Sequence, residues 1–283
     1  MDAVLSSDDS DVEAVAIDSR RRPYISSFQN LHSLAESFNV DDGFFSHCTF
    51  SYLGPNYTFY FGQSPKTKKE LTLQLISDAL KRIPAPEIYP RAPSRIKVYP
   101  HAAIDEHVYL KLPNILRYEE LAGTNLMARL CLHEVNAFEQ LERLERHHHT
   151  HPNIAKYHGC IVRGERVVGV VIDRYPITLA DRIIEEGSDA FPWENCLQRI
   201  ESAIKHLHKL GLAHNDLNPN NIMLDNSDVP YLIDLGSCRP FGKGLVTAGT
   251  VGWVDGDFTV SAIEHDEVGL RKLKAWFEKN LIK

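Results

Sequence analysis

No stretch of this 283-residue chain stays apolar for the roughly 20 residues that a membrane-spanning helix needs. The first residues, Met1 to Asp9, lack the basic and apolar regions of a secretory signal peptide. The five cysteines are scattered and odd in number, and no two have Cys-x-x-Cys spacing, so the sequence favours reduced, buried thiols over a disulfide framework. We therefore expect an intracellular protein, cytoplasmic or nuclear.

Basic residues are outnumbered, because 31 Lys and Arg stand against 38 Asp and Glu, a net charge of -7. This balance predicts no broad basic surface and therefore no nucleic-acid partner. Four neighbouring histidines raise a metal hypothesis, but no second cluster follows at zinc-ligand spacing. A basic helix end that suits the helix dipole is the favoured alternative. These histidines are His147, His148, His149 and His151.

The chain begins with a segment of biased composition. Residues 1–22 are acidic and serine-containing as far as Asp18, and they end in three arginines. This composition predicts a disordered tail. Phosphorylation of its serines is one alternative, and a tail that only solvates the chain is the favoured one.

Residues 23–86 are expected to form an α+β extension with no evident chemistry. Cys48–Leu53 and Tyr57–Phe61 are rich in aromatic and β-branched residues and flank a Gly-Pro-Asn turn, which predicts a hairpin. Thr67–Glu70 has the pattern of a capping box. We expect it to open a helix whose apolar residues follow at helical spacing. Structural support or a docking surface are both open as the role of this extension.

The stretch from 208 to 237 contains the residues that indicate chemistry. His214-Asn215-Asp216 is followed by two short apolar runs, 221–224 and 231–233, with a turn-rich segment between them. Pairing these runs as a hairpin would bring Asn221 and Asp234 to the same end. Two side-chain oxygens there could hold magnesium beside phosphates. Asp216 enters the hairpin on a loop, where its carboxylate could accept a hydroxyl proton.

This stretch resembles the catalytic and metal-binding loops of the protein kinase superfamily, which carries His-Arg-Asp-x-x-x-x-Asn and then Asp-Phe-Gly. The resemblance implies an α+β bilobal fold with a β-rich N-lobe and a helical C-lobe that is shortened after helix F. It places the N-lobe at 87–172, the hinge at 173–176 and the C-lobe at 177–283. It implies ATP and Mg²⁺ as cofactors, with Asp216 serving the acceptor and Asn221 and Asp234 holding the metal.

Further residues extend the resemblance into the N-lobe. Residues 95–99 and 107–112 are predicted strands, and Lys111 closes a Val-Tyr-Leu-Lys run like the family's Val-Ala-Ile-Lys, whose lysine grips phosphates. A long helix is predicted from 125 to 146. Glu134 lies on its apolar face with Leu130, Phe138 and Leu141, and its burial calls for a partner, which Lys111 would supply. Glu139 is the alternative to Glu134.

The predicted hinge follows a buried strand at 167–172. The resemblance makes Ile172 the residue that guards the back pocket, and it makes Asp173 and Tyr175 contacts of the nucleotide through the hinge backbone. Thr178 is a possible helix cap. An amphipathic helix is predicted from Trp193 to Leu207, and Gly211 ends it. His214, Phe138 and Leu235 would form an internal stack that links the lobes.

The sequence also departs from the family pattern. Residues 87–110 contain no glycine, so the glycine-rich loop over the phosphates is missing. Asn218 replaces the catalytic-loop lysine, which weakens electrostatic stabilisation. Asn215 replaces the arginine that reads activation-loop phosphorylation. Gly249–Trp253 resembles the end of an activation segment without Ala-Pro-Glu, and Asp266 opens a helix at the family's helix-F aspartate, which holds the catalytic loop.

We expect an ATP- and Mg²⁺-dependent phosphotransferase of protein-kinase type whose acceptor is a protein serine or threonine. One alternative is a pseudokinase, a binding or scaffold module, favoured by the missing glycines and by Asn218. The other is a small-molecule phosphotransferase of the aminoglycoside or choline kinase type, which shares His-x-Asp-x-x-x-x-Asn. The partners would be ATP and a protein or small-molecule hydroxyl acceptor.

Overall fold

The computed structural model describes residues 23–39, 42–100, 104–145, 150–184, 191–247, 249–256 and 258–281. The chain divides into two compact units, Met1–Glu87 with Asn114–Gly123, and Ile88–Pro113 with Thr124–Lys283. The predicted acidic tail and three of the four clustered histidines, His147 to His149, lie outside the described residues. No helix in the described ranges is both long and apolar enough to cross a membrane.

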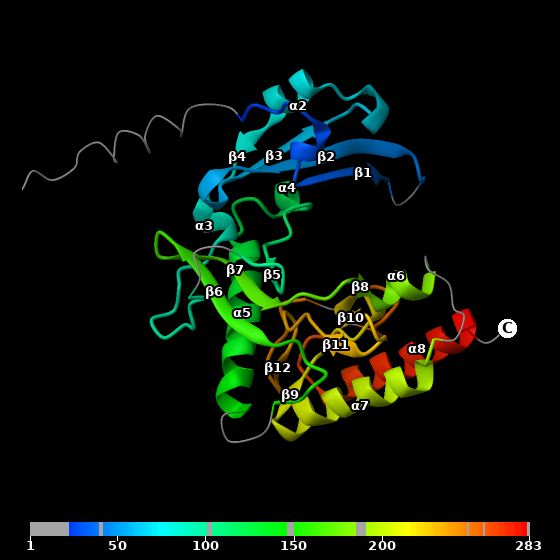
Figure 1. Ribbon diagram of the computed structural model, residues 1–283. Coiled ribbons are helices and arrows are strands. Elements are labelled where there is room, and N and C mark those ends of the chain that lie inside the picture. Colours follow the sequence, from blue (N-terminus) through cyan, green and yellow to red (C-terminus); the bar gives the residue numbers. More distant parts are fainter. Residues whose placement is uncertain are drawn as a thin grey trace, which may run out of the picture. The chain divides into compact units, whose positions relative to one another are not determined.

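The first unit is built on an antiparallel sheet (Figure 1). Its strand order is β1 (Ser33–Phe38), β2 (Phe45–Leu53), β3 (Phe59–Ser64) and β4 (Lys81–Arg82). The β2–β3 pair confirms the predicted hairpin, with Cys48 opposite Ser64. Short helices complete the unit, α2 (Leu73–Ala79), α3 (Ala85–Ile88) and α4 (Tyr118–Leu121), with 3₁₀ turns at Phe28–Asn30, Pro55–Tyr57 and Lys68–Glu70.

Alternation along β2 builds the core of this unit. Cys48 and Phe50 are fully buried and belong to one apolar cluster with Ile76 of α2 and with Leu80, the residue that follows this helix. A strand turns alternate side chains to opposite faces, so one face of the sheet is apolar and packs with the helix. The sequence pattern of the hairpin therefore determines which face α2 contacts.

The predicted capping box exists, but the helix that it was expected to open is broken. Thr67 and Glu70 cap each other across one 3₁₀ turn, with Glu70 Oε2 accepting the Thr67 N–H at 3.0 Å. Leu71 is then extended, and α2 begins at Leu73 with Thr72 as its own cap, because Thr72 Oγ1 accepts the Leu75 N–H. The second threonine cap restarts the helix and makes it shorter than predicted.

The second unit opens with an antiparallel sheet of order β5 (Val108–Lys111), β7 (Arg166–Asp173) and β6 (Tyr157–Arg163). Helix α5 (Leu126–Glu145) packs with this sheet, and it confirms the helix predicted over 125–146 as far as the described residues reach. β5 and β7 confirm the strands predicted at 107–112 and 167–172. The lobe is β-rich, as expected.

The strand predicted at 95–99 is wrong. Val98 forms a single parallel bridge with Cys160 of β6, and no ladder continues from it. The reason lies in α5, because the Lys97 N–H donates to the Glu139 carboxylate at 2.8 Å. A side chain thus takes the backbone donor that an extended ladder would need.

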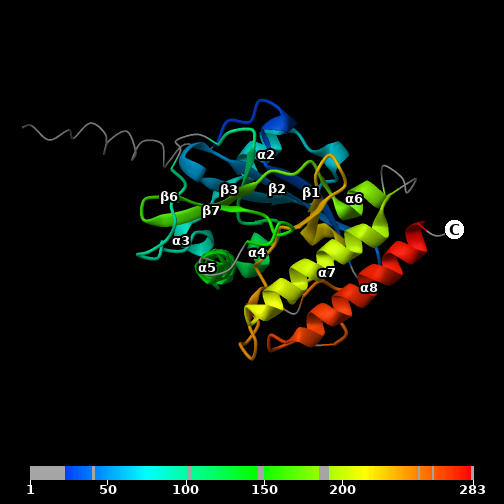
Figure 2. The same ribbon diagram turned by 60° about the horizontal axis from the view of Figure 1, so that its bottom comes forward.

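The rest of the second unit is mainly helical. It contains α6 (Leu179–Ile184), α7 (Trp193–Lys209) and α8 (Ile263–Leu281), with short strands β8 (Ile177–Thr178), β9 (Leu212–Ala213), β10 (Ile222–Leu224), β11 (Pro230–Leu232) and β12 (Arg239–Pro240). Helices α7 and α8 lie side by side (Figure 2). The predicted apolar stripe of α7 is buried from Leu197 to Leu207, and Gly211 follows the end of the helix with φ +77°. The α+β class, with a β-rich and a helical lobe, is confirmed.

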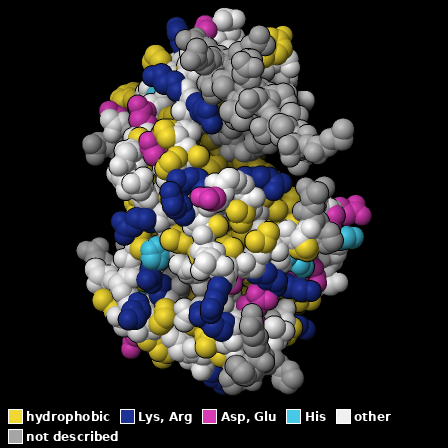
Figure 3. All heavy atoms as spheres, turned by 90° about the vertical axis from the view of Figure 1, so that its left-hand side faces the viewer, with side chains coloured by type: hydrophobic (Ala, Val, Ile, Leu, Met, Phe, Trp, Pro, Cys, Tyr) yellow, Lys and Arg dark blue, Asp and Glu magenta, His cyan; other side chains and the backbone are white. Residues whose placement is uncertain are grey.

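On the face drawn in Figure 3, lysine and arginine side chains are interspersed with acidic and apolar ones. Several basic side chains are engaged locally, such as Lys97 with Glu142 and Lys205 with Glu201.

Candidate active site

A buried carboxylate on α8 holds the loop between β9 and β10 by hydrogen bonds. Asp266 Oδ2 accepts the His214 N–H at 2.9 Å, and Oδ1 accepts the Asn215 N–H at 2.8 Å. His208 Nε2 lies 2.8 Å from the same Oδ2. The Asp266 side chain has no exposed surface, so water cannot replace these bonds. The predicted role of Asp266 in holding this loop is confirmed by these contacts.

Asp216 follows on the loop, and its carboxylate is held by three donors. Thr250 N–H donates to Oδ1 at 2.8 Å, and Asn218 Nδ2 lies 3.3 Å from the same oxygen. Asn221 Nδ2 lies 3.2 Å from Oδ2. Asn218 Nδ2 also donates to Thr250 Oγ1 at 3.1 Å, so Asn218 links the loop to the segment that contains Thr250. The carboxylate is thereby oriented while remaining partly exposed.

The hairpin expected after this loop is present. β10 pairs antiparallel with β11, with Ile222 opposite Leu232. The Ile233 N–H donates to the Asn221 carbonyl at 3.2 Å. Asp234 therefore directly follows the residue that pairs with Asn221. The amide nitrogen of Asn221 also donates to the Asp216 carbonyl, which leaves its amide oxygen as the atom suited to a cation.

Lys111 connects the two lobes of the second unit. Its Nζ lies 2.6 Å from Glu134 Oε1 on α5 and 2.8 Å from Asp234 Oδ2. The structure therefore pairs Lys111 with Glu134 and not with Glu139, whose carboxylate binds Tyr157 and the Lys97 N–H. Asp234 Oδ1 accepts the Gly236 N–H at 2.9 Å, which fixes the turn after β11.

The electrostatics of this triad follow from burial and charge. Burial alone would lower the pKa of Lys111, but the carboxylates of Glu134 and Asp234 raise it above its ordinary value. Burial would raise the pKa of Asp234, yet the adjacent ammonium group holds it below its usual range. Burial raises the pKa of Glu134 to about 7. Asp234 is therefore the permanently ionised partner of a permanently charged lysine at neutral pH.

β5 carries Lys111 at the edge of its sheet. The strand order β5-β7-β6 leaves the outer side of β5 without a partner strand in the described part of this unit. The preceding chain instead runs along the opposite edge, where Tyr99 N–H and Cys160 carbonyl bond at 2.9 Å. Within the described residues of the glycine-free segment 87–110, 87–100 and 104–110, no strand other than β5 itself forms and none pairs with the outer side of β5.

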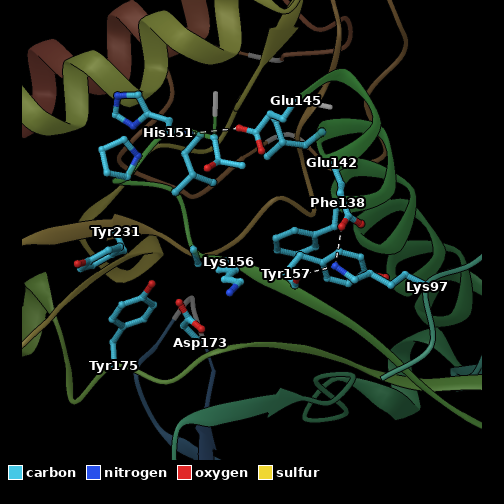
Figure 4. A pocket seen from close by; sticks show the side chains of 15 residues that line it. Lys97, Phe138, Glu142, Glu145, His151, Lys156, Tyr157, Asp173, Tyr175 and Tyr231 are labelled. Atoms are coloured by element: carbon cyan, nitrogen blue, oxygen red, sulfur yellow. Dashed lines mark hydrogen bonds and ion pairs between the residues drawn. The ribbon is translucent and has the colours of Figure 1, made fainter. Parts of the chain in front are cut away.

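The side chains of Asp173 and Tyr175, in the predicted hinge, line a cavity that is separate from the Lys111 group. Asp173 lies 2.6 Å from His158, and Tyr175 stacks on Tyr231 with ring centroids 4.2 Å apart. Both line a cavity of about 290 Å³ beside the C-terminal half of α5 (Figure 4). Lys111, Glu134, Asp216, Asn221 and Asp234 do not line it. The Asp173 and Tyr175 side chains therefore line a cavity that the Lys111 group does not share, and Ile172 is buried in the core.

The three residues of the predicted internal stack lie in the protein interior. His214, Phe138 and Leu235 are buried, and Phe138 stacks on Tyr157 with centroids 5.2 Å apart. Phe138 and Leu235 belong to one core that runs through both lobes. Among the described residues, no group of three His, Cys, Asp or Glu side chains is arranged to hold a metal ion by itself.

Sequence reasoning missed the part played by Thr250. Its N–H reaches Asp216 because the preceding Gly249 has φ +80°, a conformation that a residue with a Cβ rarely adopts. A Cβ on Gly249 would also lie 2.5 Å from Val254 Cγ1. The glycine at 249 was the available signal. The partner of Thr250, Asp216, lies 34 residues earlier in the chain, and only the fold shows that the two meet.

Comparisons with known proteins agree on one family. Residues 127–256 match the family described as the protein kinase domain. The chain is 32% identical over 132 residues to "Serine/threonine-protein kinase/endoribonuclease IRE1" of Hypocrea jecorina, covering 39% of this chain and 10% of that protein. It is 30% identical over 90 residues to "Serine/threonine-protein kinase SKS1" of Saccharomyces cerevisiae, covering 31% and 18%.

A solved kinase is also similar. The Cydia pomonella granulovirus kinase PK-1 aligns with a TM-score of 0.40 at 18% identity, covering 48% of this chain and 51% of that chain. The chain spans only a tenth to a fifth of the two curated relatives above.

Proposed function

We propose that this chain, which contains a protein-kinase-like domain, transfers the γ-phosphoryl group of ATP to a hydroxyl. The observation that carries the proposal is the ion-paired Lys111, which lies within 2.6 Å of Glu134 and 2.8 Å of Asp234. These three residues come from β5, α5 and the turn after β11, and they meet beside the loop that holds Asp216. Polar groups of this kind position and neutralise phosphates.

Each side chain has a distinct task in this proposal. Lys111 binds the α- and β-phosphates, and Glu134 holds its ammonium group in place. Asp234 and Asn221 offer a carboxylate and an amide oxygen, a donor set that suits Mg²⁺. When bound, Mg²⁺ neutralises charge on the phosphate oxygens. Asp216, whose carboxylate is already oriented by Thr250 and its neighbours, takes the acceptor hydroxyl.

The acceptor that we propose is a serine or threonine of a protein. Two curated relatives are named serine/threonine-protein kinases. The Asp216 carboxylate is bound to Thr250, in a segment that reaches the surface at Val251, which is 94% exposed. An accessible segment next to the acceptor carboxylate suits a polypeptide acceptor better than an enclosed pocket would.

The reaction is expected to be slow. Asn218 offers a dipole in place of the charge of a lysine. Its amide group already donates hydrogen bonds to Asp216 and Thr250. A neutral donor stabilises the developing phosphate charge less than an ammonium group does.

Thermal unfolding with and without ATP and Mg²⁺ tests the proposal. We expect the melting temperature to rise with millimolar ATP and Mg²⁺, and we expect Asp234→Ala to abolish the rise. Asp216→Asn should still show the rise but should lose transfer of labelled phosphate to a mixture of Ser/Thr peptides. Glu267→Gln, an exposed change on α8, is the matched control. Absence of a nucleotide-dependent rise in the unaltered protein would reject the proposal.

That negative result would instead support a binding or scaffold module. The observation that favours this second candidate is the unpartnered outer edge of β5 in the described residues of the unit. A nucleotide whose phosphates lack a covering hairpin is held by fewer backbone groups.

A further inference from the structure

The sheet of the first unit has a cavity on the face opposite α2. Cys48 and Phe50 pack toward α2, so Thr49 between them points to the other face of the sheet. A cavity of about 610 Å³ lies on that face, with residues of β1, β2 and β3 as its floor and residues 116–120 as its wall. We call it the Thr49 cavity.

The wall of the Thr49 cavity is fixed to the sheet within one unit. Tyr118 of α4 packs edge-to-face on Phe61 of β3, with ring centroids 5.5 Å apart. The Tyr118 hydroxyl also donates to Glu87 Oε2 at 2.8 Å. Asn114–Gly123 and the sheet belong to the same compact unit, so the cavity is a property of that unit alone.

The floor of the cavity offers polar groups that the protein itself does not use. Thr49 is only 4% exposed, yet its hydroxyl has no hydrogen-bond partner among the described residues, and the same holds for the Ser37 hydroxyl. Gln63 donates through Nε2 to His47 Nε2 at 3.2 Å, which leaves the Gln63 amide oxygen as an acceptor. Two hydroxyl groups and an amide oxygen are therefore available to whatever fills the cavity.

The rim of the cavity carries a negative charge. Its charged residues are Arg117, Glu119 and Glu120. Arg117 is already paired with Glu120, with Nε 2.8 Å from Oε2, whereas Glu119 has no ion pair with any described residue. One uncompensated carboxylate above unused oxygen acceptors attracts a cation and repels an anion.

Arginine is the side chain that suits this set of groups. A guanidinium group has five N–H donors in one plane, enough to bond a carboxylate, an amide oxygen and hydroxyl oxygens together. Phe38, which also lines the cavity and is 57% exposed, supplies an aromatic ring of the kind that guanidinium groups stack on. An ammonium group has three donors and would satisfy fewer of these acceptors.

The cavity lies along an edge of the sheet, because β1 is the outermost strand in the order β1-β2-β3-β4 (Figure 1). Among the described residues of this unit, no strand pairs with the outer side of β1. Ser37 and Phe38 both line the cavity, since the register of β1 shifts between them. An edge strand can bind a further strand, which turns every second side chain to the same face. A strand that pairs with β1 would thus place a side chain at the cavity.

We propose that the Thr49 cavity binds an arginine side chain of a partner polypeptide whose extended backbone pairs with the outer edge of β1. The net charge of -7 favours a basic partner. The first unit is then a recognition module, and it lies outside residues 127–256, which match the protein kinase domain. The inference goes beyond phosphoryl transfer and does not depend on it.

Isothermal titration calorimetry of the whole chain with the peptide acetyl-Val-Thr-Arg-Thr-Val-amide tests the binding. We expect saturable binding of this peptide. Citrulline in place of the arginine keeps the shape of the side chain without its charge, and it should weaken binding roughly tenfold, about 1.4 kcal/mol. Free arginine amide, which cannot pair with β1 as a strand, should also bind roughly tenfold more weakly than the peptide.

Two substitutions test whether the peptide occupies the Thr49 cavity. Thr49→Val keeps the shape of the side chain and removes a hydroxyl that bonds to no described residue. The melting temperature should therefore not fall, while the peptide binds roughly tenfold more weakly. Glu119→Gln, a change on the surface, should weaken binding by a similar factor. The matched controls, Thr58→Val and Glu106→Gln, change residues that do not line the cavity and should bind the peptide like the unaltered protein.

Each part of the proposal has its own contrary result. No saturable binding of the arginine peptide up to about 1 mM would overturn the whole proposal. Equal affinities for the arginine and citrulline peptides would overturn recognition of the cation, and equal affinities for the peptide and arginine amide would overturn the strand pairing. Full affinity in either Thr49→Val or Glu119→Gln would overturn the assignment to this cavity. None of these measurements involves ATP, so their failure is distinct from a failure of the proposed function.

Discussion

Replacing Asp266 by asparagine should lower the free energy of unfolding of the second unit by about 2–4 kcal/mol. The carboxylate accepts from the backbone of Asn215 through Oδ1 and from His214 and His208 through Oδ2. Asparagine has one oxygen and one NH₂ group in the same shape. Whichever way the amide is turned, its NH₂ group faces at least one N–H donor, so at least one buried N–H loses its acceptor.

The magnitude follows from burial. A buried donor without an acceptor costs about 1–3 kcal/mol, and hydrogen bonds to charged groups are stronger than neutral ones. Asp266 is fully buried, so no solvent compensates for the loss. Asp266→Ala removes all three contacts and should cost about 4–6 kcal/mol, a large fraction of the 5–15 kcal/mol typical of a domain. Asparagine is therefore the informative substitution.

Urea unfolding followed by tryptophan fluorescence measures the effect. The three tryptophans, Trp193, Trp253 and Trp276, all belong to the second unit, so the signal reports on that unit. The control is Glu267→Gln, an exposed neighbour on the same helix. An Asp266→Asn midpoint equal to that of the control, with the same m-value, would refute the reasoning.

Three further predictions concern the same unit. Gly269→Ala should destabilise it by about 1–3 kcal/mol despite the better helix propensity of alanine, because a Cβ there would lie 2.8 Å from Leu217 Cβ; urea unfolding measures this. Lys111→Met should abolish the ATP-dependent rise in melting temperature, whereas Lys209→Met, an exposed change at the end of α7, should leave it intact. Burial lowers the pKa of His265, so its unfolded state binds the proton more readily and stability is lost as pH falls below about 6.5; the free energy of unfolding of His265→Gln should fall less steeply than that of the unaltered protein between pH 7 and 5.5.

Long-period patterns predicted the helical framework well. Helices α5, α7 and α8 each carry an apolar stripe at helical spacing, and such a stripe stays legible over 17 to 20 residues. The loop residues from His214 to Asp234 could be placed together because only one short hairpin separates them. The spacing of these residues along the chain was therefore enough to predict that Asn221 lies near the turn that contains Asp234.

Short segments were decided by partners that the sequence does not reveal. Arg95–Tyr99 has the composition of a strand, but the carboxylate of Glu139 takes its Lys97 N–H. Residues 114–123 follow β5 directly, yet they pack with the first unit, where Tyr118 donates to Glu87 at 2.8 Å. Neither contact can be predicted from the spacing of hydrophobic residues along the chain.

The side-chain directions of the predicted hinge were equally hidden. Asp173 and Tyr175 follow a buried strand, so their position along the chain was predictable. The Asp173 carboxylate contacts His158 of β6, and the Tyr175 ring stacks on Tyr231 of β11. Asp173, the last residue of β7, and Tyr175 thus contribute side chains to the cavity of Figure 4 instead of to the Lys111 group.

Asn215 gives a physical reason for expecting a phosphorylation-independent loop. It holds a left-handed conformation with φ +65°, and its amide nitrogen lies within 2.8–3.0 Å of the Ala213 and Ser237 carbonyls and Ser261 Oγ. Its amide oxygen accepts from His265 at 3.0 Å. These neutral contacts tie the loop between β9 and β10 both to Ser237, the residue after Gly236, and to the start of α8. An arginine in this place would offer a charge that a phosphate could neutralise, but a saturated amide offers none. Order in the loop therefore comes from uncharged hydrogen bonds and one buried carboxylate, and both are present without any added phosphate.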